Sequence, residues 1–385
     1  MRVLFRGGIL ACSGYGQALR DYLMALLGVG FYAFDVQSIV DEDNALLPTR
    51  YLALAPHIVD DPQDEDYTHV VIHSDPARPA PSRFLTDVPD GVKKVLVTTW
   101  DVDRCHPYFA KKIDEQFDCV IVPSKFNVNI ATKAGVPAHK IHCIPHTFHS
   151  NWYRGREEEK ARLSSDRPYM FYNIGTWTQR KNPLAVILAY FAEFNASDHV
   201  RLLCVTNGYS KDDILNLMYA GNVRNPPGLQ ILNGWFTDEI RGFHYTGDCY
   251  VTLSRGDAFG LTAYEATLAG NRVIATGWSG LKEFLDEYPG TSYVPCFLTP
   301  TLLPTTKEQY DREEVIQEHL GPARGINYNT NWAEPNIGAC RKLMREAYEA
   351  HDRTDHRAGR YDRVLSERFS SDAVGAQLKQ VLEGL

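Results

Sequence analysis

The stretch SRGDAFGLTAYEATLAGNRVIATGWSGLKEFL, residues 254–285, is the most informative part of this 385-residue chain. Residues 250–254, YVTLS, have the apolar pattern of a buried strand, RGDAFG is a glycine-containing turn, and LTAYEATLAG has the spacing of a short helix that ends at Gly270. The N–H groups at a helix start bind anions, and Gly260 lets a phosphate approach the backbone closely. We therefore predict an anion site at residues 260–262.

Two carboxylates flank this loop. Asp257 and Glu265 stand eight positions apart around Phe259-Gly260-Leu261, so one belongs to the loop and the other lies one turn inside the helix. Both side chains can face whatever binds at the helix start. Glu265 is well placed to hydrogen-bond a diol such as a ribose.

The segment resembles the donor-binding signature of family 4 glycosyltransferases, which are retaining enzymes of the two-domain GT-B fold. That signature has two acidic residues separated by seven others, in a run like S-x-G-E-G-F-G-x-x-x-x-E-A. Here Glu265 is the second acid, and Asp257 stands where the family usually has a glutamate, one methylene longer. The resemblance implies that Glu265 holds the ribose of a nucleotide-sugar and Asp257 the hydroxyls of its sugar. The donor-binding residues implied in this way are Phe259, Gly260, Leu261, Thr262 and Glu265.

The composition is that of a globular protein with two domains. With 385 residues, 44% of them hydrophobic, the chain is long enough for two cores. The net charge of −8 argues against a nucleic-acid partner. The eight cysteines form no C-x-x-C pair, and we recognise no signal peptide, so we expect reduced thiols and a cytoplasmic location. The longest apolar stretch, residues 22–34, is too short to span a bilayer, so any membrane contact would be peripheral.

Strands alternate with helices in two successive sets, which predicts an α/β fold with two doubly wound Rossmann-like domains. The GT-B architecture implied by the resemblance would place these domains facing a cleft. We expect strands of the first set at residues 3–5, 69–73, 94–100, 119–124 and 140–146. We expect strands of the second set at residues 169–175, 201–206, 229–235, 249–254 and 272–276.

The predicted boundaries follow from a charged segment. Residues 154–167, RGREEEKARLSSDR, lack an apolar face. We therefore predict an N-terminal, acceptor-side domain over residues 1–153, a linker over 154–168, and a nucleotide-sugar-binding domain over 169–368. The family resemblance implies that a last helix, within residues 369–385, crosses back to the first domain.

A pair of cations follows the first strand of the second set, in GTWTQRKNP, residues 175–183. Arg180 and Lys181 lie where a strand gives way to a helix, and two cations there would neutralise a diphosphate leaving group. The alternative is a solvated basic pair on a loop. The family has an R/K-x-[GN] element at this place, so the resemblance extends to both residues. The family often has a further Arg after the glycine, where this chain has Thr176-Trp177.

A glycine-rich turn opens the chain: GGILACSGYGQALRDYL, residues 7–23. A plain turn also needs glycine, so the turn alone is weak support for a ligand site. In the family, a Gly-Tyr-Gly segment of the first domain faces the donor diphosphate and sugar. By position, Gly14 and Gly16 take that role.

Residues 97–148 resemble a subgroup of the family that carries T-x-W-E-[ST]-D-R, then V-P-S-x-F, A-G-V and I-P-H; here the motif reads Trp-Asp. Other members have a donor-contacting histidine after this strand, where this chain has Asp101. A carboxylate beside a transferring sugar could stabilise positive charge or accept the acceptor's proton. The structural alternative is that Asp101 caps the next helix or pairs with Arg104. His73, at the end of an earlier strand, is the second catalytic candidate.

Two patterns have the residue types of metal ligands. Asp101 and Asp103 spell D-x-D, but a three-residue match is weak, and the rest of the chain favours a fold that uses a helix dipole and basic residues instead of a metal. Strand alternation would send neighbouring side chains of the second group to opposite faces. That group comprises His139, His142, Cys143, His146 and His149. We expect no metal and no cofactor.

These features predict a metal-independent glycosyltransferase that moves a sugar from a nucleotide-sugar donor to an unidentified acceptor, such as a glycan, a lipid-linked glycan or a small molecule. Retention of configuration is implied by the family alone. A non-catalytic sugar-nucleotide sensor or partner subunit is the alternative, and a dehydrogenase is disfavoured because the first turn lacks G-x-G-x-x-G. A modified nucleic-acid base is a less favoured acceptor, since residues 1–150 hold 14 Lys/Arg against 18 Asp/Glu.

Overall fold

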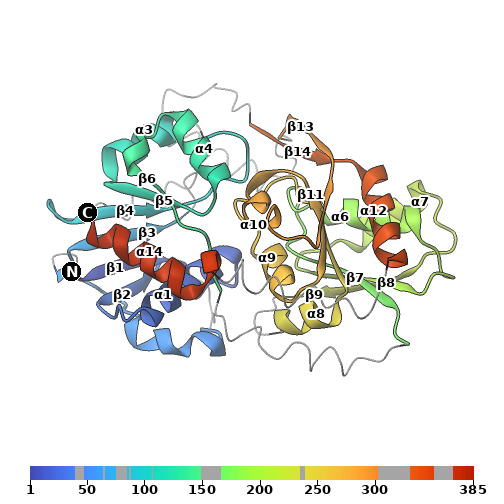
Figure 1. Cartoon of the computed structure of the whole chain (residues 1–385), viewed down its shortest axis with the longest axis horizontal. Coiled ribbons are helices and arrows are strands. Elements are labelled where there is room, and N and C mark those ends of the chain that lie inside the picture. Colours follow the sequence, from blue (N-terminus) through green and yellow to red (C-terminus); the bar gives the residue numbers. More distant parts are fainter. Residues whose placement is uncertain are drawn as a thin grey trace. The chain divides into compact units, whose positions relative to one another are not determined.

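The computed structural model divides the chain into two compact units, each described here by itself (Figure 1). Unit 1 comprises Met1–His149, Pro300–Trp332 and Arg368–Leu385, and unit 2 comprises Ser150–Thr299 and Ala333–Glu367. The structure describes residues 1–39, 47–63, 66–74, 85, 88–105, 107–148, 166–234, 239–301, 330–350 and 367–385. Most of the predicted linker, residues 154–165, lies outside the described residues.

Unit 1 contains a six-stranded parallel sheet with the strand order β2-β1-β3-β4-β5-β6. Its strands are β1 (Val3–Gly7), β2 (Phe34–Ser38), β3 (His69–His73), β4 (Lys93–Val97), β5 (Cys119–Val122) and β6 (Ile141–Cys143). The residues on both faces of the central strands are apolar because helices cover both faces, which is what a parallel sheet requires.

The helices of unit 1 form two layers around this sheet. They are α1 (Gly14–Gly28), η1 (Thr49–His57), α3 (Pro107–Gln116), α4 (Lys125–Ala134), η3 (Ala138–Lys140) and α14 (Ser371–Glu383). The last helix, α14, packs its buried Val374, Leu378 and Leu382 into the same core as α1. Gly375 permits this packing, because a Cβ there would lie 2.3 Å from the carbonyl oxygen of Ala25 in α1.

Unit 2 contains a second six-stranded parallel sheet, with the order β12-β11-β10-β7-β8-β9. Its strands are β7 (Tyr169–Ile174), β8 (Val200–Thr206), β9 (Gly228–Asn233), β10 (Cys249–Thr252), β11 (Arg272–Thr276) and β12 (Thr291–Val294). Counted from the first strand of this unit, the order is 3-2-1-4-5-6, that of a dinucleotide-binding Rossmann sheet. From the adjacent strands β7 and β10, the later strands of each half are added outward in opposite directions, so the strand order reverses between these two strands.

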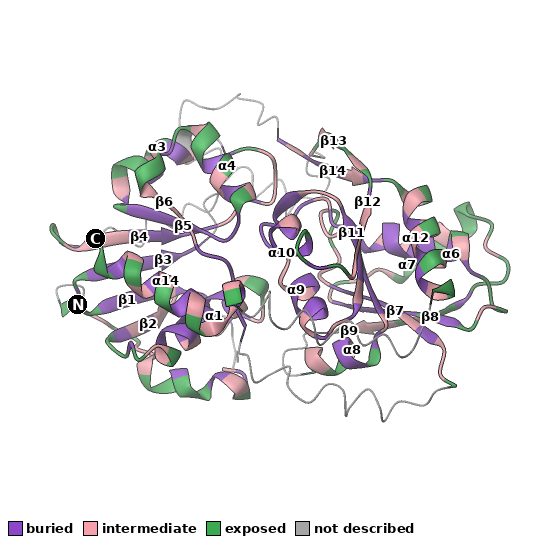
Figure 2. Cartoon of the chain, viewed as in Figure 1, coloured by how far each residue is buried: buried purple, intermediate pink, exposed green. Residues whose placement is uncertain are grey.

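The helices of unit 2 are α6 (Pro183–Glu193), α7 (Lys211–Ala220), α8 (Ile240–Thr246), α9 (Leu261–Leu268), η5 (Ser279–Leu281), α10 (Lys282–Leu285) and α12 (Ile337–Glu349). A two-stranded ribbon, β13 (Cys296–Pro300) with β14 (Asn331–Pro335), completes the described elements. Figure 2 shows that the central strands of each sheet are buried, while α3, α7 and α12 each expose one side. The predicted α/β class with two doubly wound units is confirmed.

Several predicted strands end earlier than expected. Residues 119–124, 140–146, 229–235 and 249–254 correspond to β5, β6, β9 and β10, which end at Val122, Cys143, Asn233 and Thr252. Residues 94–100 were likewise expected to be extended, yet β4 ends at Val97. The amide of Trp100 instead donates to the side chain of Asn127, and the side-chain amide of Asn127 donates back to the carbonyl of Trp100. These two hydrogen bonds satisfy the backbone of the turn without a neighbouring strand. Among the described residues, we find no helix whose length and apolar character would suit a membrane crossing.

Candidate functional site

The start of α9 lies directly after β10 and its loop, in the predicted order of strand, loop and helix. Gly260 precedes the helix with a φ of 94°, and a Cβ there would lie 2.3 Å from a methyl group of Leu281. Glycine is therefore required both for conformation and for space. Gly260 supplies no side chain to cap the first turn, so the N–H groups of that turn are available to an anion.

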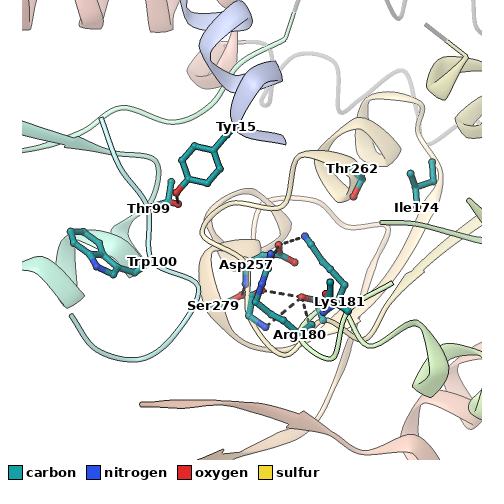
Figure 3. Close-up of polar contacts among 12 residues, drawn as sticks. Tyr15, Thr99, Trp100, Ile174, Arg180, Lys181, Asp257, Thr262 and Ser279 are labelled. Carbon is teal, nitrogen blue, oxygen red and sulfur yellow. Dashed lines mark hydrogen bonds and ion pairs between the residues drawn. The ribbon is translucent and has the colours of Figure 1, made fainter. Parts of the chain in front are cut away.

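Arg180 and Lys181 converge on Asp257 (Figure 3). Arg180 donates from Nη1 to Asp257 Oδ1 at 3.2 Å and to the carbonyl oxygen of Gly256 at 2.6 Å. Lys181 Nζ donates to the same carboxylate oxygen. Burial by itself would raise the pKa of Asp257, which is only 6% exposed, but Lys181 and Arg180 outweigh it and lower that pKa. Asp257 is thus a buried anion between two cations.

The loop after β11 holds Asp257 from the other side. Ser279 Oγ accepts a hydrogen bond from Asp257 N at 3.2 Å, and Gly280 N donates to Asp257 O at 2.8 Å. A Cβ on Gly280 would lie 1.8 Å from the carbonyl oxygen of Ala258, so the two loops touch through backbone atoms. Ser279 has a φ of 72°, which is uncommon for a residue other than glycine. The sequence analysis did not identify Ser279.

A small pocket opens beside these residues. It lies past the ends of β7 and β10, where the strand order reverses and where doubly wound sheets bind their ligands. Its lining comprises Asn173, Ile174, Gly175, Lys181, Tyr250, Thr252, Asp257, Gly260, Thr262, Ala263 and Leu281. Four of the predicted site residues are among them, namely Lys181, Asp257, Gly260 and Thr262.

The other predicted residues of unit 2 lie beside or behind this lining. Arg180 reaches the site through Asp257. Phe259 is 1% exposed and packs against the rings of Tyr264 and Phe284, so in this structure it supports the loop. Leu261 is half-buried as the first residue of α9. Glu265 is 4% exposed, and its Oε2 lies 3.5 Å from His244 Nε2; its ribose role stays a prediction.

In unit 1, the glycine-rich turn leads into α1, which begins at Gly14. Ser13 caps the helix by accepting a hydrogen bond from Gly16 N at 3.2 Å. A Cβ on Gly16 would lie 2.2 Å from the carbonyl oxygen of Ala11, so this glycine allows the turn to fold tightly over the helix start. The packing gives Gly16 a structural role, and the donor-facing role of both glycines stays a prediction.

Asp101 lies half-buried in the turn after β4. Its neighbour Asp103 forms an ion pair with Arg104, at 3.3 Å. Asp103 also accepts from the backbone and side-chain nitrogens of Asn331, at 2.7 and 2.8 Å. The structural alternative considered for Asp101 and its catalytic role both stay predictions.

His73 is 4% exposed at the end of β3, and burial lowers its pKa to about 4. The imidazole is therefore neutral near pH 7, as a general base must be. Its ring makes an edge contact with Tyr15, whose hydroxyl is 2.5 Å from Thr99 Oγ1 (Figure 3). Within the part of the chain that the structure describes, no three His, Cys, Asp or Glu side chains gather as metal ligands; His149 falls outside that part.

No family model and no curated protein sequence matches this chain. Solved structures do resemble it over its full length. The structure of HepE from Anabaena with UDP has a TM-score of 0.68 at 13% identity and covers 100% of both chains. A glycosyltransferase from Rickettsia africae has a TM-score of 0.66 at 14% identity and covers 100% of this chain and 98% of its own. Sucrose-phosphate synthase from Thermosynechococcus elongatus has a TM-score of 0.63 at 16% identity, covering 100% and 99%. These likenesses show that the chain has the α/β fold with two Rossmann-like domains known as GT-B.

Proposed function

We propose that this chain is a glycosyltransferase that binds a nucleotide-sugar donor in unit 2. The observation that carries the proposal is that Lys181 and the α9 start line one pocket at the switch point of the sheet, with Arg180 bound to Asp257 of the same lining. HepE, which has a similar fold, has been solved with UDP and with UDP-glucose, the latter at a TM-score of 0.66. Cations and backbone N–H groups in this combination can bind a diphosphate.

The charges suggest how the donor would be bound. Two cations and one carboxylate leave the cluster with a net positive charge, which favours an incoming diphosphate. The diphosphate would compete with Asp257 for Lys181. Asp257 would then be released to accept hydrogen bonds from the hydroxyls of the sugar, as the family resemblance implies. Glu265 would hold the ribose, and Gly14 and Gly16 would face the donor from unit 1.

In the reaction we propose, the bond between the anomeric carbon and the leaving phosphate oxygen breaks, and a bond from the acceptor oxygen to that carbon forms. The departing diphosphate takes the acceptor's proton, which corresponds to front-face attack with retention. Arg180, Lys181 and the α9 start stabilise the negative charge on the leaving group. No metal is required in this scheme. The acceptor is unidentified, and Asp101 and His73 are the candidates for contact with the reacting groups.

The proposal is tested by incubating the purified protein with a panel of nucleotide-sugars, including UDP-glucose. We expect at least one donor to raise the melting temperature, because a ligand that binds only the folded state stabilises it. We also expect slow hydrolysis of that donor. A panel without any shift or hydrolysis would contradict the proposal.

Binding without turnover would instead favour a sugar-nucleotide sensor or partner subunit. Asp101→Asn separates the two functions, because loss of a contact made mainly in the transition state lowers kcat and leaves donor affinity nearly unchanged. Equal rates of donor hydrolysis in both proteins would move the catalytic role to His73. The cytoplasmic location also remains part of the proposal. All eight cysteines are among the described residues, and none of them forms a disulfide.

A further inference from the structure

A buried chain of polar side chains leads from the turn between α9 and β11 to Glu265. It consists of Asn271 in that turn, Tyr172 in β7 and His244 in α8, and all three side chains are fully or almost fully buried. Asn271 Nδ2 lies 2.6 Å from the Tyr172 hydroxyl and 2.6 Å from the carbonyl oxygen of His244. The Tyr172 hydroxyl lies 2.9 Å from His244 Nδ1, and His244 Nε2 lies 3.5 Å from Glu265 Oε2.

Chemistry fixes the direction of the two hydrogen bonds from Asn271. A carbonyl oxygen can only accept, so the Asn271 atom beside it is the amide nitrogen, whose second hydrogen is donated to the Tyr172 hydroxyl. The Tyr172 hydroxyl keeps its own hydrogen, which it can donate to His244 Nδ1 at 2.9 Å. If Nδ1 accepts that hydrogen, a neutral imidazole carries its proton on Nε2, the nitrogen that faces Glu265.

The surroundings hold this arrangement in place. Asn271 donates from its backbone N–H to the carbonyl of Ala266 in α9 at 3.0 Å, and its own carbonyl accepts from the Tyr288 hydroxyl at 2.7 Å. A Cβ on Gly247 would lie 2.2 Å from the ring of Tyr172, so that ring is packed directly against the backbone at the end of α8. The polar chain is therefore built on rigid elements.

Because Glu265 is buried, its carboxyl group benefits from a polar neighbour such as His244. A carboxylate that is 4% exposed is disfavoured as an anion unless a dipole or charge faces it. The 3.5 Å separation is longer than a normal hydrogen bond, so the Nε2–H group acts as an oriented dipole. Ribose hydroxyls are donors, and an ionised carboxylate is their best acceptor.

We infer that His244 is a positioning residue, held in one tautomer by Asn271 and Tyr172, that keeps the Glu265 carboxyl group oriented for the ribose diol of the donor. The inference rests on the proposed function of this pocket. It assigns no contact between His244 and the donor. His244 contacts Oε2 of Glu265 and in this way orients the carboxylate.

The first test measures donor affinity by calorimetry, using the nucleotide-sugar of the panel that binds the parent protein most tightly. We expect His244→Leu to weaken binding about tenfold and Tyr172→Phe by about threefold to tenfold. His244→Gln should restore most of the affinity, because its amide can still donate toward Glu265. Tyr190→Phe is the matched control: it removes a hydrogen bond of the same kind, 2.9 Å to the carbonyl of Gly228, elsewhere in unit 2.

The second test determines the tautomer directly, by NMR of protein labelled with ¹⁵N in histidine. The His244 signals, identified by their loss in His244→Leu, should show a proton on Nε2 and none on Nδ1 in the parent. Tyr172→Phe should shift the ring toward a mixture of tautomers. If His244→Leu fails to fold, the loss of the same signals in His244→Gln identifies them.

The outcomes distinguish the two proposals. A parent protein that binds no nucleotide-sugar overturns the proposed function and this inference with it. A parent that binds, with His244 and Tyr172 variants no weaker than the Tyr190 control, overturns only the role of His244. A proton on Nδ1 in the parent has the same effect. Donor binding that is undiminished in Glu265→Ala overturns the ribose role of Glu265 and the role of His244 with it.

Discussion

At the scale of single residues, Asp257 sets the charge of the candidate site. Its carboxylate is shared by Arg180 and Lys181, so its burial is tolerated and its pKa is lowered. The same contacts hold both cations beside the start of α9 before any ligand arrives. An incoming anion would therefore replace Asp257 at cations that are already held in position. It would not have to order two exposed, mobile cations.

We expect Lys181→Gln to weaken the binding of a nucleoside diphosphate by about 2 kcal/mol, because a charge-assisted hydrogen bond to phosphate is lost. Calorimetry with UDP and the other nucleoside diphosphates measures the effect. Lys282→Gln is the control, since Lys282 pairs with Asp286 at 2.7 Å on an exposed part of the same unit. An affinity equal to that of the parent would remove Lys181 from the diphosphate site.

His73 makes the stability of the protein depend on pH. Its pKa is about 4 in the folded state and 6.5 when unperturbed, so between these values the unfolded chain binds a proton that the folded chain does not. The free energy of unfolding should therefore fall as the pH decreases from 6.5 to 4, with roughly 3 kcal/mol from His73. Melting temperatures between pH 7 and 4.5 should fall less steeply in His73→Gln, while the exposed His139→Gln should follow the parent.

Some of these site residues can be predicted from the sequence and others cannot, and the difference has a physical reason. Arg180, Lys181 and Asp257 each stand at a strand-to-helix transition, which a local pattern can identify. That the three side chains meet depends on β7 and β10 being neighbours, which is a long-range property. His244 and Ser279 were not predicted as site residues, although Ser279 lies within residues 254–285, because only their contacts with Glu265 and Asp257 indicate a role.

At the scale of elements, the first helix and the last one form a single layer of unit 1. Their contact depends on Gly375, where the backbone of α1 approaches α14 closely. The apolar spacing predicted the first helix, and the family resemblance implied a last helix that crosses back to the first domain. Neither predicted the close contact at Gly375, because a glycine inside a helical pattern indicates close packing only once the facing helix is known.

We expect Gly375→Ala to destabilise the protein by about 1–3 kcal/mol, because the new methyl group would overlap the carbonyl of Ala25 and push the helices apart. Urea or thermal unfolding measures the loss. Gly28→Ala is the matched control, since a Cβ at that end of α1 meets its nearest neighbour at 3.6 Å, an ordinary contact. Equal destabilisation by both substitutions would show that helix packing is not the cause.

At the scale of the whole molecule, two sheets of one architecture have different strand orders. The order in unit 1 is β2-β1-β3-β4-β5-β6, and that in unit 2 corresponds to 3-2-1-4-5-6. The alternation of strands and helices predicted the class of each sheet but not its order, because crossover connections decide which strands become neighbours. The order of unit 2 places its reversal at β7 and β10, and this places the motifs of residues 175–183 and 254–285 together.

The GT-B fold and the charges of unit 2 predict that transfer or donor hydrolysis persists in excess EDTA. The cations at Arg180 and Lys181 and the start of α9 supply the positive charge that a metal would supply on the diphosphate. A D-x-D metal site would use Asp101 and Asp103, yet Asp103 already accepts two hydrogen bonds from Asn331 and would have to lose them. The measurement is the initial rate of donor hydrolysis with and without EDTA, and with manganese added back. Loss of the rate in EDTA and its recovery with manganese would assign a metal to the reaction and contradict the mechanism that we propose.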